Sequence, residues 1–297
     1  MSSKKKTIGI IVCVIALLAL FSSPIIARAD TVKLNNGLNV FYKTSGIGYI
    51  PIVFVHGYSL SATTWDKVLG IMPVQYRSYA IDLRGFGDSG NPDTGYTYNQ
   101  MADDIAQFLD AMKIKKAILV GHSMGGMILQ HFAVLHPDRI LALVLTNTFA
   151  RNVEPKGMSE SVQKRIDGYG SKEDNRKVFT KSMPYYFDAS NLAPGDLERF
   201  VEVGLKASNN ALKDLLKQIY AAPPIPAEKF NAIKVPTLLV IATHDPFGTM
   251  KQATGINDGI QDSRIIVISH SGHSPMWERP AVWVKGVLNF FEHEGLK

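Results

Sequence analysis

Short apolar runs alternate along the chain with segments whose apolar residues recur at helical spacing. Continuous apolar runs are typical of strands buried on both faces, and they occur at residues 50–55, 79–83, 117–120, 141–145, 236–242 and 264–268. Amphipathic helices are predicted at residues 98–112, 127–135 and 278–291. This alternation predicts an α/β fold with a mostly parallel central sheet flanked by helices.

The pattern differs in two places. Residues 32–44 alternate apolar and polar positions around Asn36-Gly37, a pair that favours tight turns, so a β-hairpin is predicted there. Residues 151–232 lose the strand signal and hold amphipathic helical stretches, followed by a proline-rich return; the stretches include 162–166, 197–205 and 212–219. We therefore predict one core, made of residues 30–150 and 233–297, with a helical insertion at 151–232.

The first 29 residues have the organisation of a signal peptide. Three lysines at positions 4–6 precede a continuous apolar stretch at 8–21, and Ala27-Arg28-Ala29 supplies the small residues that signal peptidase reads. Cleavage is expected before Asp30, which predicts a protein that is secreted or held in a bacterial cell envelope. The apolar stretch is short for a membrane span, and an uncleaved N-terminal anchor remains an alternative.

Composition and charge narrow the classes of function. The chain has 297 residues, of which 46% are hydrophobic and 20% charged, as in ordinary globular proteins. Its formal net charge of +6 falls to about +2 without residues 1–29, so no dense basic surface for nucleic acid is expected. The single cysteine, Cys13, lies in that segment, so the mature chain is expected to have neither disulfides nor thiol chemistry.

The strongest chemical signal is the stretch from residue 118 to residue 130. An apolar strand runs into Gly121-His122-Ser123-Met124-Gly125 and continues as a helix. Such a turn strains the backbone of its apex residue, and the flanking glycines remove side chains that would clash. Ser123 is therefore expected to project from the carboxyl edge of the sheet, where the first amides of the helix stabilise negative charge.

Two further residues supply what a serine nucleophile needs. Asp245 follows the predicted strand 236–242, and His273 follows the predicted strand 264–268. A serine hydroxyl is a poor nucleophile unless a histidine accepts its proton, and that histidine needs a carboxylate on its other nitrogen. We therefore predict that Ser123, His273 and Asp245 converge as nucleophile, base and orienting acid.

The glycine-flanked serine and the chain order serine, aspartate, histidine resemble the α/β-hydrolase superfamily. The resemblance covers nearly all of residues 32–295. Within the superfamily, the chain is similar to small capped bacterial members, namely 3-oxoadipate enol-lactonases, arylesterases and cofactor-free haloperoxidases. It implies that residues 151–232 form a helical cap, and that the backbone N–H groups of Tyr58 and Met124 form the oxyanion hole. No metal or organic cofactor is implied, because the sequence has neither metal-spaced ligands nor a phosphate loop.

Other polar residues near these motifs are interpreted as structural. His122 is expected to face away from the site, and the side chain of His244 should point elsewhere. Some family members carry the acid at the position of Asn147, which has no charge, so Asp245 is favoured. Local hydrogen bonds that hold loops are expected from His56 and from a second set, Asp82, Arg84, Asp88 and Ser89.

The predicted function is an exported serine hydrolase that cleaves carboxylic esters through an acyl-enzyme. A serine at position 123 excludes the aspartate nucleophile that the resemblance would imply for haloalkane dehalogenases and epoxide hydrolases. Hydrolysis of a lactone or a C–C bond by the same residues remains open, as does a ligand-binding protein without turnover. The expected partner is a small-molecule ester or lactone and no nucleic acid, with membrane contact only through an uncleaved N-terminal segment.

Overall fold

The computed structural model describes residues 28–151, 157–247 and 249–297. Most of the predicted signal peptide, residues 1–27, lies outside the described residues. The first strand, β1, spans Arg28–Lys33 and therefore begins two residues before the expected cleavage at Asp30. In the part of the chain that is described, no helix has the length and apolar character needed to cross a membrane.

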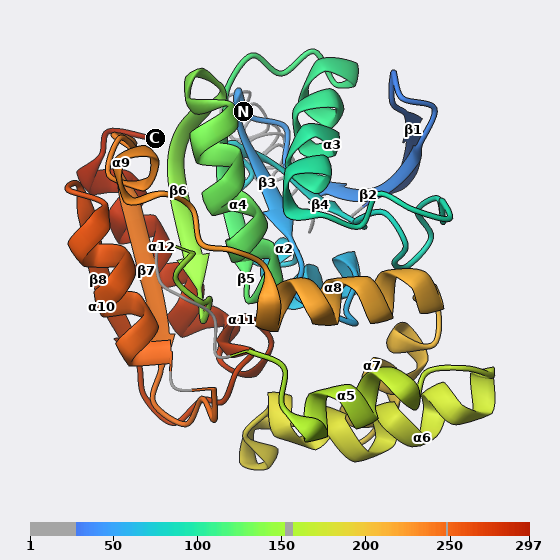
Figure 1. Ribbon diagram of the computed structural model, residues 1–297. Helices are drawn as coiled ribbons and strands as arrows, with labels where there is room; N and C mark the ends of the chain where they lie inside the picture. The colour runs from blue at the N-terminus through green and yellow to red at the C-terminus, as the bar shows by residue number, and fades with distance from the viewer. Residues whose placement is uncertain (1–27, 152–156, 248) are drawn as a thin grey trace, which may run out of the picture.

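The described residues form one eight-stranded sheet, in the order β1-β2-β4-β3-β5-β6-β7-β8 (Figure 1). β2 runs antiparallel to both of its neighbours, and all other pairings are parallel. The remaining strands are β2 (Asn39–Ser45), β3 (Ile50–Val55), β4 (Tyr76–Ile81), β5 (Ala117–His122), β6 (Ile140–Thr146), β7 (Thr237–Ala242) and β8 (Ser263–Ile268). The mostly parallel sheet that the sequence predicts is confirmed.

Helices cover both faces of this sheet. The long ones are α3 (Tyr98–Ala111), α4 (Met124–Leu135), α10 (Thr249–Gly259) and α12 (Pro280–His293), and the short ones are α2 (Asp66–Leu69), α9 (Ala227–Phe230) and α11 (Pro275–Glu278). The described residues also include four 3-10 turns, η1 (Ala62–Trp65), η2 (Pro137–Arg139), η3 (Met183–Tyr186) and η4 (Ala189–Asn191). Of the long helices on the sheet, α10 has no counterpart among those predicted from the sequence, and the short helices α2 and α9 have none either.

The central strands send alternate side chains into two separate cores, which explains their continuous apolar sequences. In β5, Ile118 and Val120 belong to a core that includes Trp65 and Trp283, on the face covered by α2 and α12. Leu119, between them, points to the opposite core with the apolar residues of α3 and α4. Apolar side chains pack closely on both faces of the sheet, and this packing holds the edge where the strands end rigidly.

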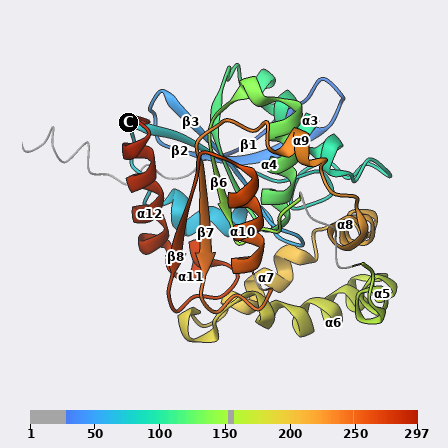
Figure 2. The same cartoon turned by 60° about the vertical axis from the view of Figure 1, so that its left-hand side comes forward.

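Four further helices lie across the carboxyl end of the parallel strands, towards which the arrowheads point (Figures 1 and 2). They fall within the predicted insertion and are α5 (Glu160–Asp167), α6 (Lys172–Ser182), α7 (Asp196–Gly204) and α8 (Asn209–Ala221). Serine N-caps at 159, 171 and 208 start three of them. Phe179, Phe200 and Leu212 from these helices are buried in the core that covers the α3–α4 face.

For the last helix and for β4, the structure explains why the bounds differ from those predicted. The last helix begins at Pro280 and not at residue 278, because Arg279 (φ −132°, ψ 53°) is not helical and separates it from α11. β4 ends at Ile81, whereas the apolar run extends to Leu83. The N–H of Leu83 donates to the ring of His56 and not to a neighbouring strand, so the sequence pattern overran the sheet.

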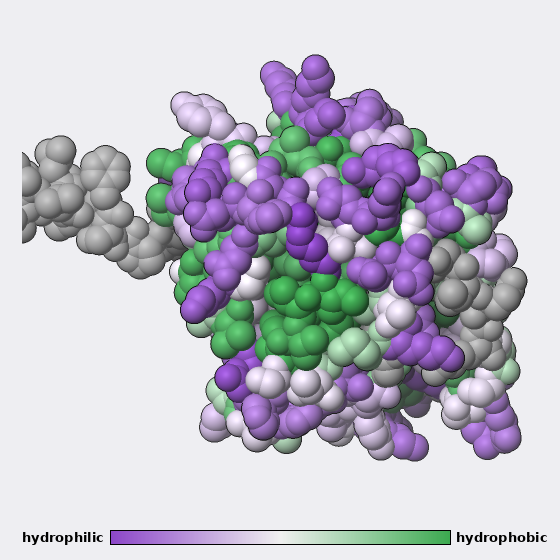
Figure 3. Space-filling model, turned by 90° about the vertical axis from the view of Figure 1, so that its left-hand side faces the viewer, coloured by the Kyte–Doolittle hydropathy of each residue, from purple (hydrophilic) through white to green (hydrophobic). Residues whose placement is uncertain are grey.

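The β1–β2 hairpin is present, with Lys33 paired to Asn39. Gly37 in its turn has φ +86°, a left-handed conformation that favours glycine. At the opposite end of the sheet, β8 is an edge strand, and Figure 3 shows an apolar area on that side among polar atoms. Ile265 and Val267 of β8 are exposed apolar residues.

Candidate active site

Ser123 lies at a sharp turn between β5 and α4. Its backbone has φ 50° and ψ −117°, a conformation that non-glycine residues rarely adopt. A Cβ on Gly125 would lie 2.4 Å from the carbonyl oxygen of Val55 and 2.6 Å from that of His56. Glycine at 125 is therefore required because the turn presses against the end of β3.

Asp245 and His273 are joined by a buried hydrogen bond. Oδ2 of Asp245 lies 2.8 Å from Nδ1 of His273, and both side chains are only 1% exposed. The other carboxylate oxygen, Oδ1, accepts the N–H of Phe247 at 2.9 Å. An ionised carboxylate accepts only, so the imidazole carries its proton on Nδ1 and leaves Nε2 as the acceptor nitrogen.

Ser123 and His273 line the same cavity, which has a volume of about 40 Å³. Strand-end and core residues form one wall of it, and helices of the insertion form the other; the remaining residues are Tyr58, Met127, Phe149, Arg165, Tyr186, Leu216, Ile219, Tyr220 and Phe247. The structure thus brings the three predicted catalytic residues together, two at the cavity wall and Asp245 behind His273. Ser123 itself remains partly exposed at this wall.

The loop after β3 presents a second feature of the predicted site. A Cβ on Gly57 would lie 3.2 Å from the Cβ of Ser123, so this loop is in contact with the serine. Tyr58 and Met124 are both buried, and their backbone N–H groups have no hydrogen-bond acceptor among the described residues. Two N–H donors without a protein acceptor, beside a nucleophile, are what an oxyanion hole requires.

His56 holds this loop by hydrogen bonding. Its Nε2 accepts the N–H of Leu83 at 3.0 Å, and its Nδ1 lies 2.8 Å from the carbonyl oxygen of Gly57, to which it donates. Both bonds require the neutral ring. Burial lowers the pKa of His56 from 6.5 to about 4, since a charged imidazole would lose its hydration there.

This low pKa predicts a stability that depends on pH. Between pH 6.5 and 4 the unfolded chain binds a proton at His56 that the folded chain does not, so the free energy of unfolding should fall as the pH falls. The expected loss from this residue is up to about 3 kcal/mol. Urea unfolding across pH 4–7 measures it, and His56→Gln should flatten the slope; an unchanged slope would show that His56 does not titrate in this way.

Two residues that the sequence analysis did not assign to the site hold the loop of His273. The buried carboxylate of Glu278 accepts the N–H of Gly272 at 2.8 Å and that of Ser274 at 3.2 Å. Its Oε2 also accepts the N–H of Asp188 at 3.1 Å, so it ties the insertion to this loop. Asn147 donates to the carbonyl oxygen of His273 at 3.0 Å.

The alternative histidines have structural contacts. His122 does not simply face away: its Nε2 lies 2.8 Å from the carbonyl oxygen of His273, and the two rings are 4.8 Å apart. Burial lowers the pKa of His122 well below its usual value, so it stays neutral. His244 points elsewhere, as expected, and pairs with Asp188 at 2.7 Å.

The loop after β4 is held partly by local bonds and partly by distant partners. Asp82 accepts the N–H groups of Ala62 at 2.6 Å and Asp88 at 2.8 Å. Arg84 pairs with Asp104 of α3, and Asp88 with Lys206 after α7. These two ion pairs therefore connect the loop to other elements.

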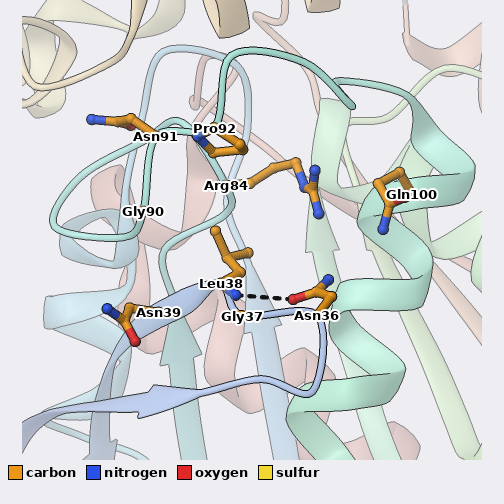
Figure 4. A pocket seen from close by; sticks show the side chains of 9 residues that line it. All are labelled: Asn36, Gly37, Leu38, Asn39, Arg84, Gly90, Asn91, Pro92 and Gln100. Carbon is orange, nitrogen blue, oxygen red and sulfur yellow. Dashed lines mark hydrogen bonds between the residues drawn. The ribbon is translucent and has the colours of Figure 1, made fainter.

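A larger hollow, of about 550 Å³, lies beside the β1–β2 hairpin and away from Ser123 (Figure 4). Amide side chains and glycines line it, and none of the predicted catalytic residues does; the lining is Asn36, Gly37, Leu38, Asn39, Arg84, Gly90, Asn91, Pro92 and Gln100.

Across the described ranges, no group of three or more His, Cys, Asp and Glu side chains could hold a metal ion.

Comparison with known proteins places this geometry in a family. The family model of the alpha/beta hydrolase fold matches residues 50–280. YisY, an AB hydrolase superfamily protein of Bacillus subtilis, is 28% identical over 264 residues, which are 83% of this chain and 93% of YisY.

Solved structures agree. The enol-lactonase of Burkholderia xenovorans superposes with a TM-score of 0.78 at 24% identity, covering 89% of this chain and all of that one. A thermophilic esterase of Thermogutta terrifontis gives a TM-score of 0.77 at 22% identity, covering 90% of this chain and 99% of that one. At these identities the structural likeness shows the fold. The relatives support hydrolase activity. The match of the family model across most of the chain shows that this protein belongs to the α/β-hydrolase fold family.

Proposed function

We propose that the protein is an exported serine hydrolase that cleaves carboxylic esters through an acyl-enzyme. The observation that carries this proposal is the buried Asp245–His273 hydrogen bond, with His273 in the wall of the cavity that Ser123 also lines. An acid, a base and a nucleophile in this order are what acyl transfer to a serine requires.

The proposed chemistry has the following steps. Nε2 of His273 takes the proton of Ser123 as Oγ attacks the ester carbonyl, and Asp245 stabilises the imidazolium. The N–H groups of Tyr58 and Met124 bind the oxyanion. His273 then gives the proton to the leaving alcohol, and water repeats the steps on the acyl-enzyme to release the acid.

The direct test is turnover of p-nitrophenyl acetate and butyrate by the purified protein. We expect p-nitrophenol release with a burst, if deacylation is slower than acylation. A panel that adds an aliphatic lactone and a vinylogous 1,5-diketone distinguishes ester from lactone and C–C bond hydrolysis. Binding of ester without turnover of any substrate would support a ligand-binding protein and contradict the proposal.

Export is part of the proposal. It rests on the basic start, the apolar stretch and the Ala27-Arg28-Ala29 site in the sequence. Cleavage before Asp30 would remove only two residues from the start of the edge strand β1, Arg28 and Ala29, which are exposed. N-terminal sequencing of the protein expressed from its full gene in a bacterium should give Asp30 as the first residue; an intact first segment in the cytoplasm would contradict export.

Glu278→Gln is expected to lower kcat by about tenfold to a hundredfold. Every group that the carboxylate accepts is an N–H donor, so an amide NH₂ would face a donor and displace the loop of His273. Steady-state kinetics and the pH profile of kcat measure the effect, because a displaced base alters its acid limb. Glu228→Gln, on an exposed residue of α9, is the control; equal activity of the two variants would contradict a positioning role.

A further inference from the structure

One cationic side chain of the insertion lines the cavity of Ser123. Arg165 of α5 shares that cavity with Ser123 and His273. Its Nε donates to the phenolic oxygen of Tyr169 at 3.1 Å, and its Nη2 to that of Tyr186 at 3.3 Å. Its guanidinium also lies 5.3 Å from the centre of the Tyr58 ring.

Among the described residues, no carboxylate balances the charge of this guanidinium. In the described part of the chain, none of the ion pairs includes Arg165, and neither Asp nor Glu lines the cavity. Arg84, which is buried, pairs with Asp104. The two arginines therefore differ in their partners. Arg165 contacts three phenol side chains, whereas Arg84 pairs with a carboxylate.

Two of the three phenols do not supply the missing negative charge. Burial raises the pKa of Tyr58 and of Tyr169 above the usual value of 10, so both remain neutral at physiological pH. A guanidinium keeps its proton under all ordinary conditions. A partly buried cation that faces a reaction cavity and lacks an anion is therefore prepared to bind an anion that arrives with the ligand.

We infer that the substrate of this hydrolase carries a carboxylate, which Arg165 binds while the ester lies at Ser123. The inference rests on the proposed function and adds the substrate class to it. Tyr169 and Tyr186 fix the guanidinium on two of its donors, which leaves Nη1 to make a charge-assisted bond to a carboxylate. The carboxylate belongs either to the acyl part or to the alcohol part of the ester.

Matched ester pairs test the inference and separate these two sources. On the acyl side, monomethyl glutarate is compared with methyl pentanoate, which has a methyl group where the other has a carboxylate. On the alcohol side, 3-acetoxypropanoate is compared with propyl acetate. We expect kcat/KM to favour the anionic ester by about tenfold to a hundredfold in one arm, as a charged hydrogen bond would. A preference for the neutral ester in both arms, or none, would overturn the inference.

Variants show whether Arg165 causes the preference. Arg165→Met should collapse the ratio of kcat/KM between anionic and neutral esters to about one, and Arg165→Lys should keep part of it. Lys164→Met removes the same charge from an exposed neighbour on α5 and should leave the ratio unchanged. If Arg165 only held its tyrosines in place, Arg165→Met would lower both rates together and leave the ratio as it is, which would contradict the inference.

Product binding gives a readout that does not need turnover. Calorimetric titration of glutarate and of 3-hydroxypropanoate into Ser123→Ala should show binding of one of them, which Ser123→Ala/Arg165→Met loses by about tenfold or more. No binding of either product would overturn the inference. If the unsubstituted protein hydrolyses no ester but the product still binds, the proposed function is contradicted and the anion site is not. The two failures are therefore distinguishable.

Discussion

Ser123→Ala is expected to lower kcat for p-nitrophenyl butyrate by about 10⁴- to 10⁶-fold. Alanine keeps the strained turn between β5 and α4, because the substitution removes only the oxygen, but it leaves no atom that can form the acyl-enzyme. The proposed oxyanion donors and His273 stay in place, so a small residual rate above that of water is expected. Purified protein assayed with and without the substitution gives the measurement.

A matched control is needed because the turn is strained. Ser161→Ala changes an exposed serine on α5 and should leave kcat within twofold of the unsubstituted protein. The melting temperature of Ser123→Ala should equal or exceed that of the unsubstituted protein, because the serine hydroxyl is placed for catalysis and not for the stability of the fold. Substantial activity in folded Ser123→Ala would require another nucleophile.

Asp245→Asn is expected to lower kcat by about 10³- to 10⁴-fold. Its Oδ1 can still accept the N–H of Phe247, so the amide NH₂ is directed at Nδ1 of His273 and holds the wrong tautomer of the ring. His273 then presents a proton to Ser123 and cannot accept one. Because geometry is preserved, KM should change little while kcat falls.

The control for this variant is Asp138→Asn, on an exposed residue of η2. Kinetics over pH 5–9 add a second readout, because the residual activity of Asp245→Asn should rise with hydroxide concentration once the normal base is lost. A fall of less than tenfold would show that Asp245 does not orient His273 during the reaction.

The parts of the site that the sequence predicts are those encoded by local rules. Gly125 is required because the turn lies close to the end of β3, and Gly121 because a side chain there would meet the backbone of Gly125 and Gly126. Both glycines can be recognised in the sequence before these contacts are known. Buried strands predict where Asp245 and His273 emerge, because parallel strands end at one edge. The mostly parallel sheet and the family are confirmed for the same reason, since apolar runs and their order carry both.

The parts that the sequence does not predict depend on contacts between distant segments. Glu278 looks like the first residue of a surface helix, yet a break at Arg279 turns it back onto the loop of His273. Arg165 looks like one of several basic residues on an amphipathic helix, and only the packing of the insertion places it in the cavity wall. Helix α10 follows β7 without a strong apolar stripe, so its sequence alone gives little signal.

The most direct test of the account is the site of covalent modification by a serine-directed fluorophosphonate. We predict a single phosphonyl adduct per chain, located on Ser123 by mass spectrometry of peptides, and formed far more slowly when His273 is replaced by alanine. An adduct on a different residue, or hydrolysis of esters that continues undiminished in protein fully labelled at Ser123, would contradict the account.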